Sequence, residues 1–516
     1  MGAWHWECPC ILRRSSLFLN RRQTMKYLLG IDVGTTGTKS LLFSEAGTLL
    51  GSAYRAYPTA MPGLELREQD PEDWWRAVVD TVRELCTDPK VCRNVAGISL
   101  SLQGGTMVPV DEHGAAVRSA MVWSDKRCVA QKEAYLREVG DADTMYRKTG
   151  WKLGSGLNAN QIRWMRDNEP ENFARTKLFL SVPDYISLKM TGVAACDMSD
   201  AGINQLANIR EFAYDPQLLA FAGITEERLP KLVRSGEVIG HLTEQAAAEL
   251  GLTTDCVLVA GAHDQYAVAL GAGACNAGDI LIGSGTAWVV TAIGDAPDFD
   301  SGFAQSVAAS PGKWGTLRSL GTGGVCLEWW RKNLAVGPDH EPVSYTVINE
   351  EVARRRAAED GLFFYPFSGC ATQEKSFRKA TFVGLDLSHD RFDMARAIME
   401  GVAFQIVWMM EAFKTKPSKE GLKMAGGAAK SELWCQILAD IANLPVRIPE
   451  VADLACVGAA VLAGTGCGIY HTVEEGYRCL AVKERLITPD PRRAEQYAEL
   501  RKEYQRYAAA LGTAYQ

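Results

Sequence analysis

Two apolar runs separated by a polar turn lie in the stretch YLLGIDVGTTGTKSLLF, near the start of the chain. The apolar run at 27–33 predicts a buried strand interrupted by one carboxylate, Asp32. A turn of small residues follows, and the run at 40–43 predicts a second, antiparallel strand. We expect Gly34 and Gly37 to take positive φ and to bring backbone N–H groups close to an anion.

Polar side chains of this turn suit a phosphate group. Thr35, Thr36 and Thr38 supply hydroxyl donors, and Lys39 supplies a positive charge. A carboxylate at a strand end beside such a turn could hold a hydrated Mg²⁺, which makes Asp32 the candidate metal residue. The alternative is an ordinary glycine-rich hairpin with a polar tip, so the motif by itself leaves both interpretations open.

A second stretch, DILIGSGTAWVVT at 279–291, repeats the order of strand, small-residue turn and strand. The two stretches lie about half a chain apart, which indicates an internal duplication. Two facing turns, the second with Gly285 and Thr286 at its tip, could hold a polyphosphate from both sides. Neither stretch matches GxxxxGK[ST] or GxGxxG, so neither a P-loop nor a Rossmann site is predicted.

Two further strands of the first half end in polar residues. The buried run at 95–102 leads to Gln103, and the short run at 120–123 leads through Trp123 to Asp125. An aromatic ring beside a carboxylate and an amide makes a plausible sugar site, because rings stack on the apolar faces of sugars while polar groups bind the hydroxyls. The alternative is a Trp packed in the core beside a solvated turn.

In the second half, the apolar run at 256–260 leads to His263, Asp264 and Gln265. Asp264 is a second carboxylate after a buried strand, and its alternative role is to cap a helix. We expect His263 to pack or to support its neighbours, because no Cys or His stands at metal-ligand spacing from it. Further on, a glycine turn at 321–324 precedes a helix.

A long apolar helix is predicted at 391–413, and the strand at 421–425 ends in Gly426 and Gly427. A Gly-Gly turn where a strand meets a helix lets a flat ring lie against the backbone, because no side chain intervenes. A charged amphipathic helix begins at Asp490 and Pro491, and we expect it to dock on the surface of the fold.

Length and composition restrict the remaining possibilities. A chain of 516 residues exceeds what one hydrophobic core usually supports, so two or more domains are expected. The net charge of −7 argues against general binding of nucleic acid or anionic membrane. Fourteen Cys residues without a CxxC pair indicate reduced thiols in a cytoplasmic protein, and no apolar run reaches membrane-spanning length. Residues 1–24 are expected to form an extension outside the fold, with a targeting peptide as the alternative.

From Met25 onwards the motifs resemble those of the FGGY carbohydrate kinases, which belong to a superfamily with heat-shock chaperones and actin. GIDVGTTGTKSLLF resembles the first phosphate motif of that family and ILIGSGTAWVV the second. GLKMAGGAAKSELWCQILADIANLPV is similar to its adenosine motif and C-terminal signature, and ACVGAAVLAG follows in the same order. The resemblance covers about residues 26–480. It implies an α/β fold of two actin-like, ribonuclease H-like domains with the active-site cleft between them.

The resemblance also implies roles for individual residues. Asp264 matches the catalytic aspartate, the base for the substrate hydroxyl, and Asp32 matches the carboxylate near Mg²⁺. The matches on the sugar side, besides Asp264 itself, are Gln103, Trp123, Asp125 and Gln265. Those on the ATP side are Thr35, Thr36, Lys39, Gly285, Thr286, Gly323, Gly426 and Gly427.

The implied reaction is transfer of the γ-phosphate of ATP to a hydroxyl of a small sugar, with a ketopentose such as xylulose as the first expectation. The alternatives are another substrate of the family, such as a deoxyketose, a tetritol or another polyol, or a nucleotide-binding relative without kinase activity. Xylulokinases carry Met-His after the Gln that matches Gln103, where this chain has Gly104 and Gly105. The parts that handle phosphate are therefore retained and the parts that handle sugar are altered.

The expected domains are residues 25–262, with the sugar site and first phosphate motif, and residues 263–483, with the nucleotide site, followed by a packed C-terminal helix at 484–516. The expected partners are ATP, Mg²⁺ and a sugar or polyol. Neither nucleic acid nor a membrane is expected, and a homodimer is allowed.

Overall fold

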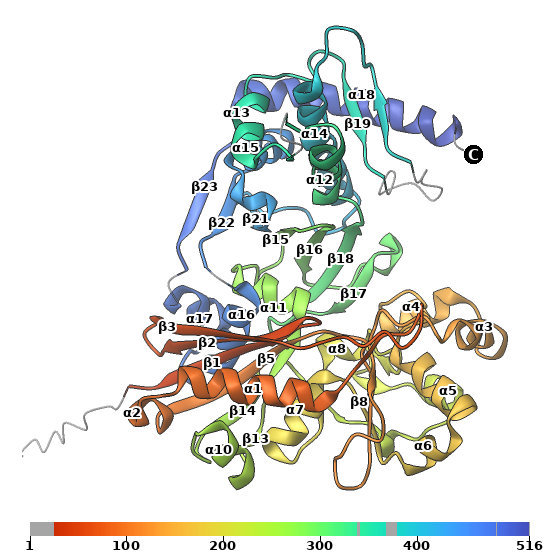
Figure 1. Cartoon of the computed structure of the whole chain (residues 1–516), viewed down its shortest axis with the longest axis vertical. Coiled ribbons are helices and arrows are strands. Elements are labelled where there is room, and N and C mark those ends of the chain that lie inside the picture. Colours follow the sequence, from red (N-terminus) through yellow and green to blue (C-terminus); the bar gives the residue numbers. More distant parts are fainter. Residues whose placement is uncertain (1–24, 338–340, 368–378, 452, 481, 515–516) are drawn as a thin grey trace, which may run out of the picture.

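The computed structural model describes residues 25–337, 341–367, 379–451, 453–480 and 482–514. The expected extension at 1–24 lies outside the described residues. Two α/β domains are stacked along the longest axis of the molecule, the N-terminal domain below and the C-terminal domain above in Figure 1. Each domain is built on one large sheet, and each sheet contains one of the two predicted hairpins.

The sheet of the N-terminal domain has the order β13-β14-β5-β1-β2-β3. Strands β1 and β2 form the predicted hairpin, with Asp32 opposite Lys39, and β5 and β14 then continue the sheet in parallel with β1. Because parallel strands end at the same edge, the residues after β1, β5 and β14 lie together. The strands are β1 (Tyr27–Val33), β2 (Gly37–Ser44), β3 (Leu49–Ala56), β5 (Val95–Leu102), β13 (Val238–His241) and β14 (Val257–His263).

The sheet of the C-terminal domain has the order β17-β18-β16-β15-β21-β22-β23. Its hairpin β15–β16 is antiparallel, and β15 pairs in parallel with β21, so the second predicted turn lies beside the Gly-Gly turn. The strands are β15 (Ile280–Ser284), β16 (Trp288–Gly294), β17 (Ala304–Val307), β18 (Trp314–Leu320), β21 (Leu422–Gly426), β22 (Val446–Pro449) and β23 (Glu484–Ile487).

Helix α1 (Pro71–Leu85) covers one face of the N-terminal sheet and has Pro71 at its first position, which is common at the start of helices. Asp70 caps its first turn by accepting from Glu72 N, and Trp74 and Val78 are fully buried. A lobe inserted between β5 and β14 lies on the right of the lower domain in Figure 1. The helices and short helical turns of this domain that lie between α1 and β14 along the chain are α2 (Pro89–Cys92), α3 (Val129–Glu138), α4 (Ala142–Thr149), α5 (Asn158–Asn168), α6 (Pro170–Arg175), α7 (Val182–Thr191), α8 (Met198–Ala201), α9 (Pro216–Ala222) and α10 (Glu244–Leu250).

Short strands form five two-stranded ladders outside the large sheets in the described part of the chain. Most of them shape the inserted lobe and its junction with the N-terminal sheet. They are β4 (Glu68–Gln69) with β7 (Ala120–Met121), β6 (Val108–Val110) with β8 (Leu178–Leu180), β9 (Ala195–Asp197) with β12 (Lys231–Val233), β10 (Ala207–Asn208) with β11 (Ala213–Tyr214), and β19 (Phe363–Tyr365) with β20 (Thr381–Val383).

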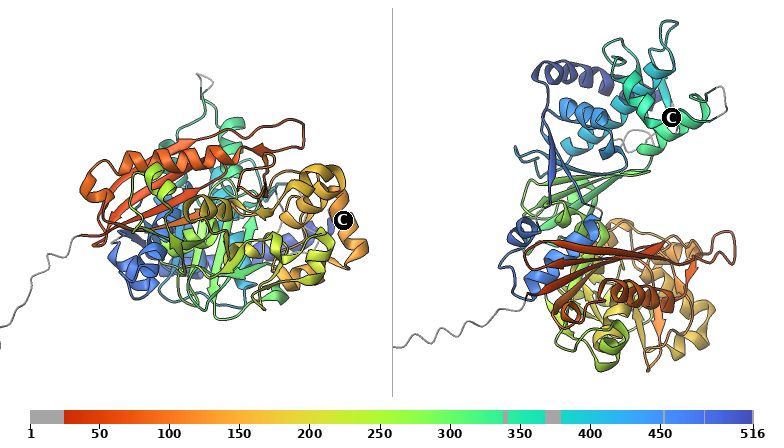
Figure 2. Two further views of the ribbon diagram at one scale, coloured as in Figure 1. Left: turned by 90° about the horizontal axis from the view of Figure 1, so that it is seen from below. Right: turned by 60° about the vertical axis from the view of Figure 1, so that its left-hand side comes forward.

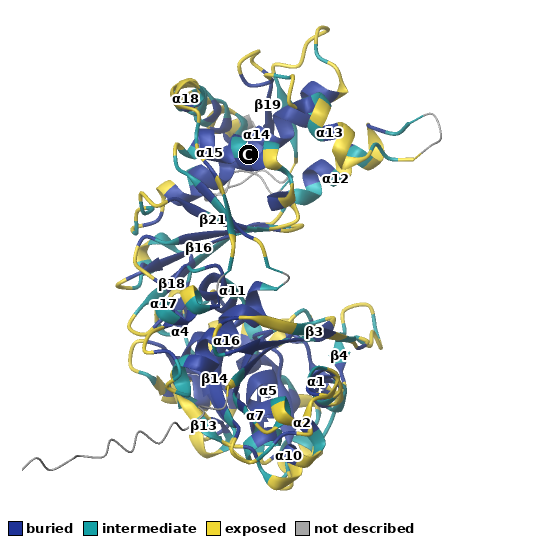
Figure 3. Ribbon diagram, turned by 90° about the vertical axis from the view of Figure 1, so that its left-hand side faces the viewer, coloured by how far each residue is buried: buried dark blue, intermediate teal, exposed yellow. Residues whose placement is uncertain are grey.

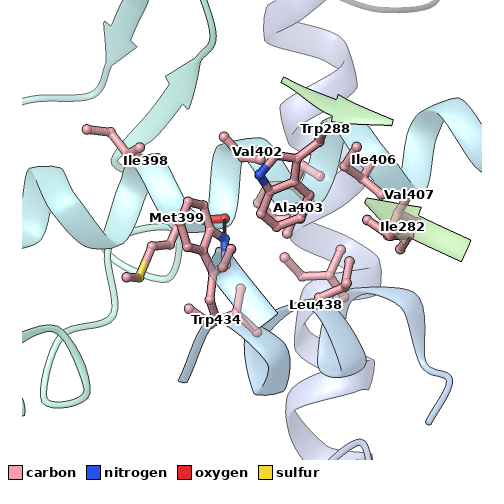
Figure 4. Close-up of a cluster of buried hydrophobic side chains, with 14 of the residues drawn as sticks. Ile282, Trp288, Ile398, Met399, Val402, Ala403, Ile406, Val407, Trp434 and Leu438 are labelled. Carbon is pink, nitrogen blue, oxygen red and sulfur yellow. Dashed lines mark hydrogen bonds between the residues drawn. The ribbon is translucent and has the colours of Figure 1, made fainter. Parts of the chain in front are cut away.

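The core of the C-terminal domain forms around α14 (Arg391–Glu411), the predicted long apolar helix. Trp288 and Trp434 meet there with ring centroids 5.1 Å apart, and Trp434 Nε1 donates to Met399 O at 3.0 Å (Figure 4). The C-terminal helix α18 also enters this core through Tyr497 and Tyr504. The helices are α12 (Gly324–Asn333), α13 (Tyr345–Val352), α14, α15 (Glu432–Ala442) and α18 (Pro491–Ala514).

Two helices, α11 (Asp264–Gly271) and α16 (Leu454–Gly466), connect the domains and pack against each other at the waist of the molecule (Figures 1 and 2). Their backbones touch, because a Cβ on Gly271 would lie 1.9 Å from Leu454 O and one on Gly458 would lie 2.0 Å from Ala267 O. Helix α16 then packs on β1, β5 and β14.

The packing of α16 bears on the predicted domain boundaries, which stay a prediction. The segment of α16 and α17 (Val473–Cys479) was assigned to the C-terminal domain, yet α16 lies against the N-terminal sheet. A Cβ on Gly30 of β1 would lie only 1.9 Å from Cys456 O. The chain thus returns to the first domain after β22 and crosses back at β23, which the order of motifs along the sequence does not reveal.

A second contact between the domains is made by the inserted lobe and the edge strand β17. Tyr146 Oη donates to Phe303 O at 2.7 Å, Gln305 N donates to Gly150 O at 2.8 Å, and Ser306 Oγ donates to Ser199 O at 2.7 Å. Figure 3 shows that buried residues continue from one domain to the other through this waist. None of the helices in the described ranges is long and apolar enough to cross a membrane.

The helix crossing gives a test of the fold. Gly458→Ala should lower the free energy of unfolding by about 1–3 kcal/mol, because the new methyl overlaps Ala267 O. Ala is otherwise the better helix residue, so a loss of stability can only come from the overlap. Gly240→Ala is the control, since its Cβ would meet only Thr191 at 3.5 Å. Equal denaturant midpoints for Gly458→Ala and the parent would contradict the crossing.

Candidate active site

The first hairpin forms as predicted, but its glycines act differently from expectation. Neither Gly34 nor Gly37 takes a positive φ. The turn is closed by Gly34 N donating to Gly37 O at 3.1 Å. A Cβ on Gly37 would lie 2.5 Å from Tyr54 Oη and 2.6 Å from Arg55 O, so this glycine is needed for the close approach of β3.

The hydroxyl of Thr35 connects the hairpin to two predicted sugar-site residues. Thr35 Oγ1 donates to Gln103 Oε1 at 3.0 Å and accepts from Trp123 Nε1 at 3.3 Å. Gln69 completes the network, because its Nε2 donates to Thr35 O at 2.7 Å and its Oε1 accepts from Gln103 Nε2 at 3.3 Å. The ring of Trp123 is half exposed. The phosphate turn and the predicted sugar site are therefore one hydrogen-bonded unit.

Two adjoining cavities extend from this unit into the C-terminal domain. The lower cavity, about 620 Å³, contains Asp32, Thr35, Gln103 and Asp264 in its wall. The upper cavity, about 670 Å³, lies entirely in the C-terminal domain, and its wall includes Gly285, Thr286, Gly324, Met399, Ser431 and Trp434. Gly427 and Lys430 belong to both walls, so the cavities meet at the Gly-Gly turn.

Asp32 lies near the end of β1, and its Oδ1 accepts a hydrogen bond from Ser101 Oγ at 2.7 Å. Burial, together with the carboxylates of Asp453 and Asp264, raises the pKa of Asp32 to about 7, although the bond from Ser101 opposes the rise. Oδ2 makes no hydrogen bond with any described residue. A partly buried carboxylate with one free oxygen in a cavity wall suits a hard cation that completes its coordination with water and phosphate oxygens. Within the described ranges, no group of three or more His, Cys, Asp or Glu side chains could hold a metal.

Asp264 begins α11, and its two oxygens have different surroundings. Oδ1 accepts from Gln265 N at 2.6 Å and lies 3.1 Å from His263 Nδ1. Oδ2 has no hydrogen-bond partner among the described residues, and the side chain is 41% exposed. The cap of α11 is His263, whose Nδ1 accepts from Gln265 N at 3.4 Å, so the alternative role of Asp264 as the helix cap is not taken up.

The Gly-Gly turn is held by the second hairpin. Ser284 Oγ donates to Ala425 O at 2.6 Å and accepts from Ala429 N at 3.2 Å. Gly426 has φ +102° and leaves no room for a side chain, whereas a Cβ on Gly427 would meet only Ser284 O at 3.6 Å. The predicted Gly323 packs against Trp288, and its neighbour Gly324 lines the upper cavity instead.

Comparison with known proteins identifies this arrangement. The N-terminal domain of the FGGY family of carbohydrate kinases matches residues 27–271, and its C-terminal domain matches residues 280–467. The chain belongs to the FGGY family of carbohydrate kinases. The predicted family and the predicted pair of actin-like α/β domains are thereby confirmed, and the chain is a sugar kinase.

Among its relatives, a gluconokinase of Bacillus subtilis (strain 168) is 28% identical over 86% of this chain and 88% of its own. An L-xylulose/3-keto-L-gulonate kinase of Escherichia coli (strain K12) is 29% identical over 94% of this chain and 97% of its own. The structure of a xylulose kinase from Rhodospirillum rubrum superposes with a TM-score of 0.86 at 26% identity, covering 95% of this chain and 100% of the other.

In this FGGY kinase, Asp125 does not take the place predicted for it at the sugar. Its carboxylate is fully buried and accepts from Arg67 N at 2.7 Å, from Arg127 N and Nε at 2.9 Å each, and from Arg127 Nη2 at 2.7 Å. Burial acts to raise its pKa, but the bonds from Arg127 and the backbone outweigh it and hold the pKa of Asp125 below its ordinary value. Asp125 therefore fixes the loop that presents Trp123.

Two predicted phosphate contacts of the kinase are also placed elsewhere. Lys39 Nζ forms an ion pair with Asp453 Oδ2 at 2.8 Å and does not line either cavity. Thr36 is exposed at the tip of the hairpin, and its carbonyl accepts from Tyr54 Oη at 3.3 Å and from Tyr57 N at 3.3 Å. Of the hydroxyl residues in this turn, Thr35 is the one in the cavity wall.

The structure adds residues to the site beyond the predicted catalytic and binding residues, and among them only His263 had been expected to support its neighbours. Gln69, His263, Lys430, Asp453 and Arg485 touch the predicted residues or line the cavities. His263 is held by Ser199 Oγ, which accepts from His263 N at 2.8 Å, and by ring contacts with Trp151 and Tyr266. Lys430 lies three residues after Gly427, at the end of the short helical turn that follows the Gly-Gly turn, and this proximity is the signal that the sequence offers for it.

The raised pKa of Asp32 gives a test in metal-free kinase. The folded-state pKa of about 7 lies above the ordinary value of 3.8, so folding loses stability as the pH rises from about 4 through 7. Asp32→Asn should remove that loss and stabilise the protein at pH 8 by up to about 4 kcal/mol, because one pKa unit corresponds to about 1.4 kcal/mol. Denaturant titrations at pH 5 and pH 8 in a chelator would measure it. If the free energy of unfolding changes with pH equally in parent and variant, the pKa of Asp32 is not raised in the folded protein.

Proposed function

We propose that this FGGY kinase transfers the γ-phosphate of ATP to a hydroxyl of a small ketose or polyol, with xylulose as the first candidate. The observation that supports this most directly is the position of Asp264. Its free Oδ2 shares the lower cavity with Asp32 and Thr35, and that cavity meets a second one at the Gly-Gly turn. An acceptor hydroxyl and a nucleotide can therefore approach each other from opposite sides.

Asp264 would act as the general base through Oδ2. His263 and the backbone of Gln265 hold Oδ1, which fixes the plane of the carboxylate and directs the free oxygen to the cavity. The hydroxyl proton passes to Oδ2 as the oxygen of the sugar attacks the γ-phosphorus, and the bond between phosphorus and the β,γ-bridging oxygen breaks.

The nucleotide would lie with its adenosine in the upper cavity. Met399 and Trp434 supply an apolar wall there, and the polar groups of Asn349 and Ser431 lie at the same wall. Gly427 lets the phosphates pass to the lower cavity. Asp32 would hold Mg²⁺ through its free oxygen, and bound Mg²⁺ would neutralise phosphate charge.

The sugar would lie against Trp123 and Gln103, where a ring face and an amide meet the hydrogen-bonded Thr35. There is no room for a side chain at Gly104, because a Cβ there would lie 2.5 Å from Asp200 Oδ1 and 2.7 Å from His263 Cδ2. The relatives include kinases for gluconate and for xylulose at similar identity. A screen of ketoses, aldonates and polyols for ADP release would decide the substrate, and no turnover with any of them would contradict the proposal.

Asp264→Asn tests the base. A general base contributes about 10²–10⁴-fold in rate, so turnover with the best sugar should fall by about that factor or more. Asn can still accept from Gln265 N, so folding and ATP binding should persist, which melting curves and calorimetry would check. Turnover near the parent rate would place the base elsewhere.

Gly427→Val tests the junction of the cavities. The Cβ of the new side chain would meet only Ser284 O, at the ordinary distance of 3.6 Å, so we expect the fold to tolerate the substitution. It would project where the two cavities meet, and ATP affinity measured by calorimetry should fall at least about tenfold. Sugar binding in the absence of nucleotide should be retained. Unchanged ATP affinity in folded protein would remove Gly427 from the site.

A further inference from the structure

The wall of the lower cavity is divided by charge. Its carboxylates, Asp32, Asp264 and Asp453, stand on β1 and at the beginnings of α11 and α16. Its cations, Lys430 and Arg485, both belong to the C-terminal domain. A polyphosphate in this cavity would be repelled by the first wall unless a metal intervenes, and it would be attracted by the second.

Arg485 lies on β23, opposite Ile448 of β22, and both residues line the cavity. Its Nη2 donates to Ala429 O at 2.9 Å, which is the one hydrogen bond of the guanidinium within the described chain. Its Nη1 also forms a long ion pair with the largely exposed Glu432, whose Oε2 lies 3.9 Å away. The guanidinium is therefore fixed at the Gly-Gly turn while its charge and other N–H donors stay available to a ligand.

Lys430 ends the short turn that follows Gly427, and it lines both cavities. Its Nζ makes no hydrogen bond or ion pair with any described residue. Lys39 offers a contrast, because its ammonium is already paired with Asp453. Of the described side chains that line the lower cavity, the cationic ones are therefore those of Lys430 and Arg485, and Lys430 also lines the upper cavity.

We propose that Lys430 and Arg485 form a phosphate-binding pair on the C-terminal domain that holds the diphosphate part of the nucleotide. This inference rests on the proposed use of ATP. The N-terminal wall would then favour the cation and the C-terminal wall the anion. Arg485 has the further effect of linking phosphate binding to the Gly-Gly turn, since its other contact is the carbonyl of Ala429.

The test compares ligands that differ only in phosphate. Purified full-length kinase, Arg485→Gln and Lys430→Gln would be titrated with ADP and with adenosine by calorimetry. Loss of a hydrogen bond to a charged group should weaken ADP binding about 10-fold or more in each variant and leave adenosine binding within about twofold. Raising the salt concentration should weaken ADP binding less in the variants than in the parent, because fewer charges remain to be screened.

Two further variants make the result specific. Arg447→Gln is the matched control, because Arg447 lies on the neighbouring strand, pairs with Glu484 at 3.3 Å and lines neither cavity. It should bind ADP as the parent does. Arg485→Lys keeps the charge and should recover part of the ADP affinity. Should Arg485→Gln fail to fold, the exposed Lys430 still provides a variant with the parent melting temperature.

The outcomes separate this inference from the proposed function. Equal weakening of ADP and adenosine would mean that Arg485 only braces the turn, and unchanged ADP affinity in both variants would remove the pair from the site; either result overturns the inference. If the parent binds neither ADP nor ATP, the proposed function fails and the inference falls with it.

Discussion

The site depends on the backbone contact between α11 and α16. Gly271 and Gly458 let the two helices approach so closely that a Cβ on either would overlap a carbonyl oxygen of the other helix, and that contact fixes how the helices lie against each other. Helix α11 begins with Asp264, and α16 is capped by Asp453, so one packing contact sets the positions of two carboxylates in the cavity wall. Side chains larger than hydrogen at these two glycines would push the helices apart and displace the two carboxylates from the cavity wall.

Placing several carboxylates in one cavity wall lowers the stability of the fold, and the structure offsets this loss only in part. Asp453 is neutralised by Lys39, and Asp32 receives one hydrogen bond from Ser101, but burial still raises the pKa of Asp32 to about 7. An unsatisfied buried carboxylate destabilises a fold and is retained where a ligand compensates it. The proposed nucleotide and Mg²⁺ would account both for the raised pKa of Asp32 and for the cations on the opposite wall.

The sugar side is organised differently, through neutral hydrogen bonds. Gln69, Gln103, Thr35 and Trp123 form one network. The residues predicted to face the sugar, Gln103 and Trp123, are therefore bonded to the hydroxyl of Thr35, which is predicted to face the phosphate. Asp125 and Arg127 lie behind this network as a buried ion pair and determine its shape. Substrate choice in this kinase would therefore depend on the loop that the ion pair supports as well as on the residues in contact.

Several features could be predicted from the sequence because they are local. Both hairpins, the strand that ends in Gly426 and the cap of α1 follow from spacings of a few residues, and the motifs in order identify the family. Asp32, Thr35, Asp264 and Gly427 line the cavities because each directly follows, or lies within, a strand whose end is fixed by the sheet.

The tertiary structure alone decided which polar groups are already paired. Lys39 and Asp453 are 414 residues apart, and no local pattern predicts that the lysine of the phosphate motif is neutralised by a helix cap. The burial of Asp125 and the place of Arg485 depend likewise on contacts between distant segments. Sequence periodicity determines which face of an element is buried, whereas the partner of a charge is set by how whole elements pack, and that is why the roles of these charged residues became visible only in the folded chain.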